Sequence, residues 1–167
     1  MSPLRTLVVL GLAVCSVVGA AACGDAGAAP VQEIQPLKVE AMPPQVLDLA
    51  VTPESIEAAQ GIRRPYIEAV ALHSLRRGAL LQATLQVSRF HESADVNSAR
   101  FRGAVVRQIG STVPRQFHMG RDTVWLTEGR RQSIAIWFRD NHVFVLATRD
   151  EYEQPRALLR ALLEVEP

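Results

Sequence analysis

The strongest constraint on the fold is an apolar hairpin near the end of the chain, over residues 134–148. Asp140 and Asn141 separate its two apolar runs, and both residue types tolerate the positive φ that a two-residue turn requires. Such a turn predicts apolar pairs on both faces: Phe138–Val143, Ile136–Val145 and Ile134–Ala147 on one, and Trp137–Phe144 and Ala135–Leu146 on the other. We therefore expect this hairpin to lie inside a sheet that is covered, at least in part, on both sides.

Two more hairpins are predicted upstream of it. The stretch Tyr66–Phe90 contains a turn signal at residues 76–78, followed by an alternation of polar and apolar residues that is typical of a strand. A second hairpin is expected where Phe117 and Val124 flank a Gly120-Arg121 turn. Pro114 lies at the start of that strand and favours an edge position, because proline donates no ladder hydrogen bond.

Helices are expected at three places. After a short strand over residues 47–51, Thr52 and Pro53 are typical of a helix start, and Gly61 of its end. A second helix, capped by Ser93 or Asp95, places Phe101, Val105 and Ile109 on one face and ends at Gly110. A third begins at Pro155, and its leucines form one stripe: Leu158, Leu159, Leu162 and Leu163.

Together these elements predict an α+β domain over residues 46–167. It consists of an antiparallel sheet of about five to seven strands with two main helices packed on it. The order of elements is loosely similar to the single-sheet α+β folds of the photosystem PsbP type. That similarity concerns topology alone, and a shared topology implies no function.

The chain begins with a segment of different character. Arg5 precedes a run of apolar residues from Leu7, and small residues follow it up to Cys23. A positive charge, an apolar core and a small-residue cleavage site, in this order, form the layout of a secretory signal peptide.

The end of this segment resembles the signal of bacterial lipoproteins. Ala20, Ala21, Ala22 and Cys23 occupy the four positions of that signal, although leucine or valine is commoner at the first. The resemblance implies cleavage after residue 22, diacylglycerylation of the Cys23 thiol, and a membrane anchor on the extracytoplasmic side. Cys15 is a poorer acceptor because bulky Val14 precedes it and its apolar core is short.

Two alternatives remain open for this segment. Ordinary signal peptidase would also cleave after Ala22 and would release a soluble protein with a free Cys23. An uncleaved transmembrane anchor is less favoured, because the apolar run falls short of the roughly 20 residues that a spanning helix needs. Residues 23–45 are rich in Gly, Ala and Pro, so we expect them to form a lipidated, flexible tether.

Charge and cysteine content narrow the function classes. The formal net charge is +1, and removing residues 1–22 takes away only Arg5, which leaves a net charge of zero. A neutral chain has no global field that attracts nucleic acid, so nucleic acid is excluded as an expected partner. The mature chain would keep no cysteine for a disulfide.

The domain shows no sequence motif for catalysis, nucleotide binding or metal binding. No nucleophile elbow, phosphate-binding loop or zinc spacing is present, and we expect no cofactor and no metal. Four histidines, His73, His91, His118 and His142, lie far apart in the sequence. Arginine pairs at several turns could clamp a phosphate or carboxylate, but solvated turns explain them equally simply. Trp137 and Phe144 would mark a docking face if their side of the sheet is uncovered, and core packing otherwise.

The sequence thus favours a membrane-anchored extracytoplasmic lipoprotein with a non-enzymatic binding or accessory module. Its expected partners are membrane lipid, through the acylated Cys23, and an envelope protein or a small ligand. The alternative is a secreted or surface enzyme, such as a hydrolase, with catalytic residues dispersed along the sequence.

Overall fold

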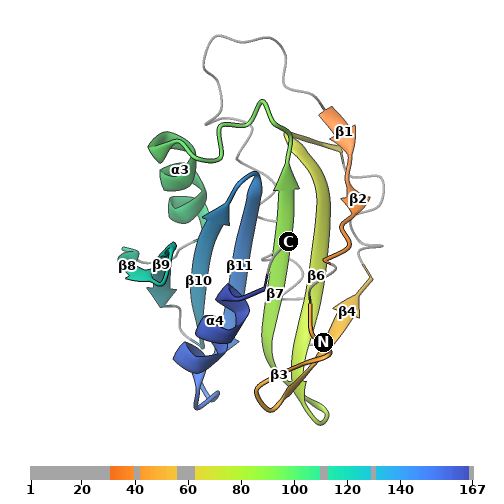
Figure 1. The fold of residues 1–167 in the computed structure, drawn as a ribbon, viewed down its shortest axis with the longest axis vertical. Helices are drawn as coiled ribbons and strands as arrows, with labels where there is room; N and C mark the ends of the chain where they lie inside the picture. Colours follow the sequence, from red (N-terminus) through yellow and green to blue (C-terminus); the bar gives the residue numbers. More distant parts are fainter. Residues whose placement is uncertain (1–30, 40–41, 56–62, 110–112, 129–130, 166–167) are drawn as a thin grey trace.

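The computed structural model describes residues 31–39, 42–55, 63–109, 113–128 and 131–165. Over these residues the chain forms one large, strongly twisted sheet of nine strands with a helix against each face (Figure 1). The α+β class is therefore as predicted, but the sheet has more strands than the five to seven expected. The additional strands are short pieces at its edges, and runs of two residues leave no readable alternation in a sequence.

Neighbouring strands of the sheet are mostly antiparallel. In spatial order its strands are β3 (Gln45–Val46), β4 (Leu49–Glu54), β6 (Ile67–Arg77), β7 (Leu80–Phe90), β11 (His142–Arg149), β10 (Gln132–Arg139), β9 (Asp122–Glu128) and β8 (Arg115–Met119). The ninth strand, β2 (Gln35–Pro36), pairs in parallel with β6. A separate two-stranded ladder joins β1 (Val31–Glu33) to β5 (Arg63–Pro65).

The three predicted hairpins are confirmed as β6–β7, β8–β9 and β10–β11. The last has the predicted register, with Trp137 opposite Phe144 and Ile136 opposite Val145. Asp140, in its turn, has a φ of 48°. Strand β8 follows Pro114 and lies at one end of the sheet, which is the edge position that the proline favours.

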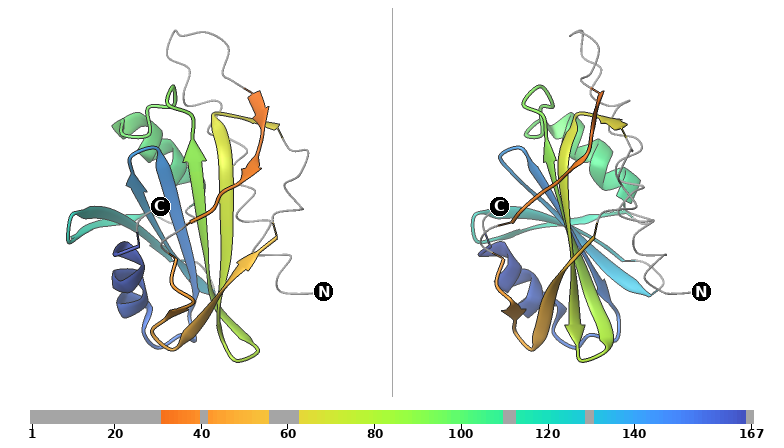
Figure 2. Two further views of the ribbon diagram at one scale, coloured as in Figure 1. Left: turned by 45° about the vertical axis from the view of Figure 1, so that its right-hand side comes forward. Right: turned by 90° about the vertical axis from the view of Figure 1, so that its right-hand side faces the viewer.

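Helices α3 (Ala99–Ile109) and α4 (Pro155–Leu163) lie on opposite faces of the sheet (Figure 2). α3 buries Phe101 and Val105 against the face that carries Ile136 and Val145. α4 buries the predicted leucine stripe against the face of Trp137 and its neighbours. The two apolar faces of the β10–β11 hairpin thus belong to two separate cores.

The expected cap of α3 is wrong. Ser98, rather than Ser93 or Asp95, caps the helix, because its hydroxyl accepts a hydrogen bond of 3.1 Å from the backbone N–H of Phe101. The Ser98 hydroxyl also donates a hydrogen bond to the carbonyl of Asp95, which closes the turn before the helix. The predicted cap residues therefore lie in the loop that leads to the helix.

The helix expected to begin at Thr52 and Pro53 is also wrong over its described part. Pro53 and Glu54 continue strand β4, where Pro53 lies opposite His73 of β6. On its other side β4 pairs with β3 only at Ala50 and Leu49, so the missing N–H of Pro53 breaks no ladder. The rest of the expected helix, up to Gly61, falls outside the described residues.

The tether expected over residues 23–45 is wrong for its described part, and the domain begins before residue 46. Ile34 is only 3% exposed and joins the core on the α3 side, while Val39 joins the core on the α4 side. The backbone N–H of Leu37 donates to the carbonyl of Val70, at 2.8 Å. Strand β2 covers the part of the β6 edge that β4 leaves open, at Ala69 and Val70. A single short strand paired in parallel gives no pattern that distinguishes it from a linker.

Candidate functional site

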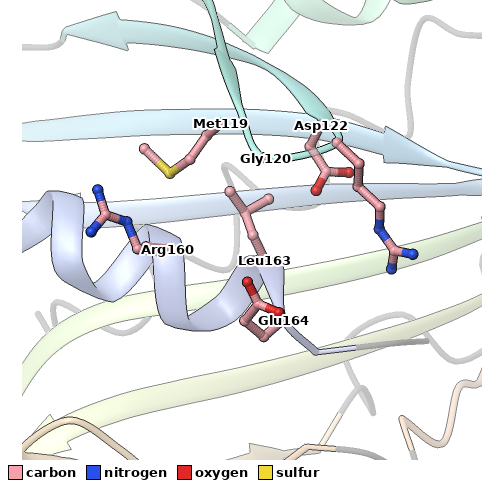
Figure 3. A pocket seen from close by; sticks show the side chains of 7 residues that line it. Met119, Gly120, Asp122, Arg160, Leu163 and Glu164 are labelled. Carbon is pink, nitrogen blue, oxygen red and sulfur yellow. The ribbon is translucent and has the colours of Figure 1, made fainter.

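A groove runs along α4 on the side that faces the β8–β9 hairpin. Its larger segment has a volume of about 660 Å³ and lies between the first half of α4 and strands β8 to β11. A second segment, of about 590 Å³, lies between the turn of the hairpin and the end of α4. Met119 and Arg160 line both segments, so we treat the two as one feature, the α4 groove, of which Figure 3 shows the second segment.

The floor of the α4 groove is a row of paired residues that crosses four strands. Ala135 on β10 lies opposite Leu126 on β9 and opposite Leu146 on β11. Leu126 is in turn opposite Arg115, on the edge strand β8. Because Ala135 carries only a methyl group between two leucines, the row is low at its centre. The floor is therefore apolar, with an arginine at its outer end.

The walls of the groove come from α4 and from the hairpin. Leu159 faces the floor from α4, and Phe117 and Met119 face it from β8. Figure 3 shows Met119 reaching from the hairpin toward the helix, on the side where Arg160 rises from α4. Phe117 and Met119 are only partly buried, so apolar side chains remain within reach of a ligand.

The charges along the larger segment do not balance. Arg115 is paired with Glu128 across the β8–β9 ladder. Arg156 and Arg160 lie four residues apart on α4, so their side chains are neighbours on one face of the helix. Among the described residues, neither guanidinium has an ion pair or hydrogen bond. The larger segment therefore carries two positive charges without an ion pair, and Glu164 lines the second segment four residues beyond Arg160.

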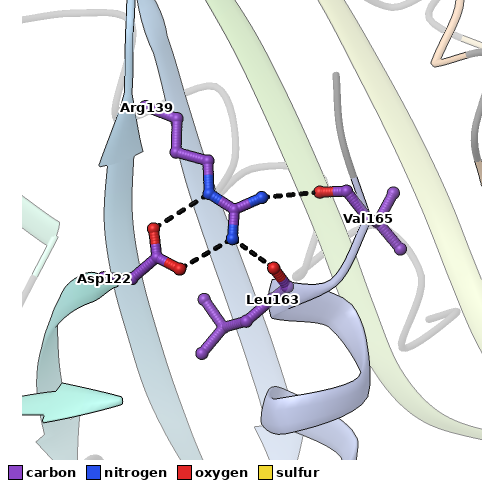
Figure 4. Close-up of polar contacts among 4 residues, drawn as sticks. All are labelled: Asp122, Arg139, Leu163 and Val165. Carbon is purple, nitrogen blue, oxygen red and sulfur yellow. Dashed lines mark hydrogen bonds and ion pairs between the residues drawn. The ribbon is translucent and has the colours of Figure 1, made fainter. Parts of the chain in front are cut away.

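The carboxyl end of α4 is held to the sheet by a buried ion pair (Figure 4). The guanidinium of Arg139 donates two hydrogen bonds to the carboxylate of Asp122, of 2.9 and 2.7 Å. It also donates to the carbonyls of Leu163 and Val165. The side chains are 9% and 6% exposed, so this cation lies at the negative end of the helix dipole in a largely dry site.

The segment before α4 is held by a second polar cluster. The hydroxyl of Tyr152 donates a hydrogen bond of 3.2 Å to Asp48, in the turn before β4. Arg77 pairs with the same carboxylate, which lowers the pKa of Asp48, and it lies over the Tyr152 ring. Burial and the bond to Asp48 raise the pKa of Tyr152 to about 12. Both ends of α4 are thus attached to the sheet, and the wall of the groove is anchored at each end.

The docking face expected at Trp137 and Phe144 is not a surface. The two side chains are 0% and 1% exposed and stack on each other, with ring centroids 5.0 Å apart and planes 9° from parallel. They lie in the core that α4 covers, in the row next to the floor of the groove. The docking interpretation is therefore wrong, because α4 covers this face, and the core-packing alternative holds.

The four histidines are dispersed over the structure. His73 lies in β6, His91 follows β7, His118 lies in β8 and His142 begins β11. His118 is exposed, and its ring contacts the hydroxyl of Thr123 at 3.2 Å. Burial lowers the pKa of His73, and burial together with Arg89 lowers that of His142. None of the four lines the α4 groove as the described residues define it.

The expected lipidation residue, Cys23, lies outside the described residues, so lipidation stays a prediction. Within the described ranges no helix has the length and apolar character to cross a bilayer. The same ranges contain no group of three or more His, Cys, Asp and Glu side chains arranged to hold a metal ion.

The groove was not predictable from the sequence. Its residues come from four strands and a helix that are spread over residues 115–164, and no local spacing links them. The only available signal was the pair Arg156 and Arg160, on the flank of the leucine stripe of α4.

No family model, curated protein or solved structure matches this chain. A function must therefore be proposed from the amino-terminal signal and from the α4 groove.

Proposed function

We propose that this protein is a lipoprotein, anchored through acylated Cys23 on the extracytoplasmic side of the membrane. Its folded part is a non-enzymatic binding module that uses the α4 groove. The order of charge, apolar run and small residues up to Cys23 supports the anchor. The observation that carries the binding role is the groove itself, an apolar hollow with two unpartnered arginines on its rim.

The chemistry of the groove favours binding over catalysis. Among the described residues that line it there is no histidine and no cysteine. Of its three carboxylates, Asp122 is held by Arg139 and Glu128 by Arg115, while Glu164 is exposed at the end of α4, in the second segment only. A general base needs a free, titratable group within reach of the substrate, whereas paired carboxylates and guanidiniums are suited to holding an anion.

The extent of the domain also bears on the anchor. Only residues 24–30 separate Cys23 from β1, in place of the longer tether that the sequence suggested. Eight steps of fully extended chain reach about 28 Å at most, and a coil of that length spans about 15 Å. An anchor at Cys23 would hold the domain close to the bilayer surface.

Labelling with a palmitate analogue in bacterial cells tests the anchor. We expect the wild-type chain to take up the label and to fractionate with membranes, and the Cys23→Ala variant to lose both properties. Cys15→Ala serves as the matched control and should behave as wild type. Label on the Cys23→Ala variant, or none on the wild type, would contradict the anchor.

A photoreactive side chain placed in the groove tests the binding role. We expect a diazirine-bearing residue at position 117, whose side chain faces the groove from β8, to form an adduct of defined mass in cells. The same residue at position 107, on the opposite side of the sheet, provides the control. Equal adducts at both positions, or none at position 117, would sink the proposal that the groove binds.

A further inference from the structure

We propose that the α4 groove binds a single-chain amphiphile with an anionic head group, either a carboxylate or a phosphate. The alkyl chain lies on the apolar floor, and the head group lies between Arg156 and Arg160. This inference rests on the proposed role of the groove as a binding site, and it specifies the chemistry of the ligand.

The charge pattern selects the head group. Arg156 and Arg160 are exposed, lie one helical turn apart, and have no acidic partner among the described residues. By contrast, Arg77, Arg115 and Arg139 each pair with a carboxylate. Guanidiniums bind carboxylates and phosphates through two parallel hydrogen bonds, so an anionic group bridging the two arginines would complete the site.

The floor and the size of the groove indicate what the rest of the ligand is. Six apolar residues line the larger segment, Phe117, Met119, Leu126, Ala135, Leu146 and Leu159, and Ser133 and Thr148 add two hydroxyl groups to its lining. Its volume of about 660 Å³ lies within the range of roughly 300–1,000 Å³ that is typical of small-ligand pockets. The second segment adjoins the first at Met119, so a long alkyl chain can extend from one segment into the other. A small polar anion would leave this apolar surface in contact with water.

The position of the domain favours an amphiphile over a soluble ligand. With β1 starting at residue 31, the first residue of the described domain stays within about 28 Å of an anchor at Cys23. Single-chain amphiphiles are concentrated in that layer. An acidic protein segment is the competing occupant, but a stable protein interface generally buries more than about 1,000 Å², well beyond one trough beside a nine-residue helix.

Photolabelling of the full-length anchored protein in isolated membranes tests this inference. The probes are a diazirine-bearing palmitic acid, the corresponding alkyl phosphate and the corresponding uncharged alcohol. The readout is the label on the tryptic peptide 116–121, which contains Phe117 and Met119 and is the same in every variant below. The peptide 90–100 reports background labelling.

We expect the acid and the phosphate to label peptide 116–121 strongly, and the alcohol to label it about tenfold less. The double variant Arg156→Gln/Arg160→Gln should lower labelling by the acid about tenfold, because charge-assisted hydrogen bonds to the head group are lost. The control Arg107→Gln removes an exposed arginine from α3, on the other face, and should leave labelling unchanged. Thermal unfolding checks that the variants fold, and inorganic phosphate in large excess should not displace the acid.

Four outcomes would overturn the inference. Equal labelling by the alcohol, or full labelling of the double variant, would show that the head group is not recognised. Displacement by inorganic phosphate would show that the alkyl chain is not needed. No label in peptide 116–121 from any probe would exclude an amphiphile. In that last case an adduct at position 117 in cells would still support the groove as a binding site for another ligand, and its absence would remove both proposals.

Discussion

Arg139 is the residue on which the placement of α4 most depends. Its guanidinium joins the carboxylate of Asp122, on β9, to two carbonyls at the end of the helix. A buried ion pair contributes modestly to stability as a whole, but removing one partner leaves an uncompensated charge in a dry site. The groove wall therefore depends on a contact between residues that are more than twenty positions apart in sequence.

We predict that Asp122→Asn lowers the free energy of unfolding by about 3–5 kcal/mol, because the charge of Arg139 then lacks its partner. The measurement is urea unfolding followed by circular dichroism. The control is Glu128→Gln, which breaks an exposed pair with Arg115 and should cost less than about 1 kcal/mol. Similar losses of unfolding free energy in both variants would mean that the buried Arg139–Asp122 pair stabilises the fold no more than an exposed pair does.

His73 makes the fold sensitive to acid. It is 6% exposed, and its Nδ1 atom has no hydrogen-bond partner among the described residues. Burial lowers its pKa below 6.5, so the unfolded chain binds a proton more readily than the folded chain. The resulting stability is fully present above pH 6.5 and is lost as the pH falls through the folded pKa.

We predict that the unfolding midpoint falls as the pH is lowered from 7 to 5, and that His73→Leu makes this dependence shallower. Each buried histidine contributes a slope of at most about 1.4 kcal/mol per pH unit, and His142 contributes part of the remainder. His118→Gln is the control, since its ring is exposed beside Thr123. A His73→Leu variant with the wild-type pH profile would show that His73 does not titrate on unfolding.

Among the elements, strand β2 and the residues beside it differ most from what the sequence predicted. Ile34 lies between β1 and β2 and packs with Phe90 and other residues in the core on the α3 side. A sequence with repeated prolines and alanines indicates a linker when read locally. The partner that orders this segment, the open stretch of the β6 edge, is more than thirty residues away.

We predict that Ile34→Ala lowers the free energy of unfolding by about 2–4 kcal/mol, because it opens a cavity in a core that excludes solvent. Gln35→Ala, at the exposed next position, should change it by less than about 0.5 kcal/mol. Urea titration of both variants gives the comparison. If Ile34→Ala is as harmless as Gln35→Ala, the segment is a tether after all.

The elements that the sequence predicted correctly are those whose partners are adjacent in the chain. The β10–β11 register follows from the Asp140-Asn141 turn alone, because a two-residue turn leaves one alignment of its strands. The leucine stripe of α4 follows from helical periodicity. The groove and the role of Pro53 depend instead on distant strands, and a local pattern carries no information about which strand lies alongside.

At the scale of the whole molecule, the sheet separates two cores, and the candidate site belongs to one of them. α3 covers one face and α4 the other (Figure 2). On the second face, α4 and the β8–β9 hairpin line the groove. The side chains expected to dock a partner, Trp137 and Phe144, support the groove from beneath rather than bind. In our account the anchor sets where the domain lies, and the α4 side sets what it holds.

The most direct test of this account uses two methionines that follow the proposed cleavage site, Met42 and Met119. Met119 lines both segments of the α4 groove, whereas Met42 packs elsewhere on the same core. The measurement is a dodecanoate titration of the lipidated protein in nanodiscs, followed through ¹³C-labelled methionine methyl groups. Our account predicts a saturable shift of the Met119 resonance while that of Met42 stays in place. An unchanged Met119 resonance, or equal shifts of both, would contradict it.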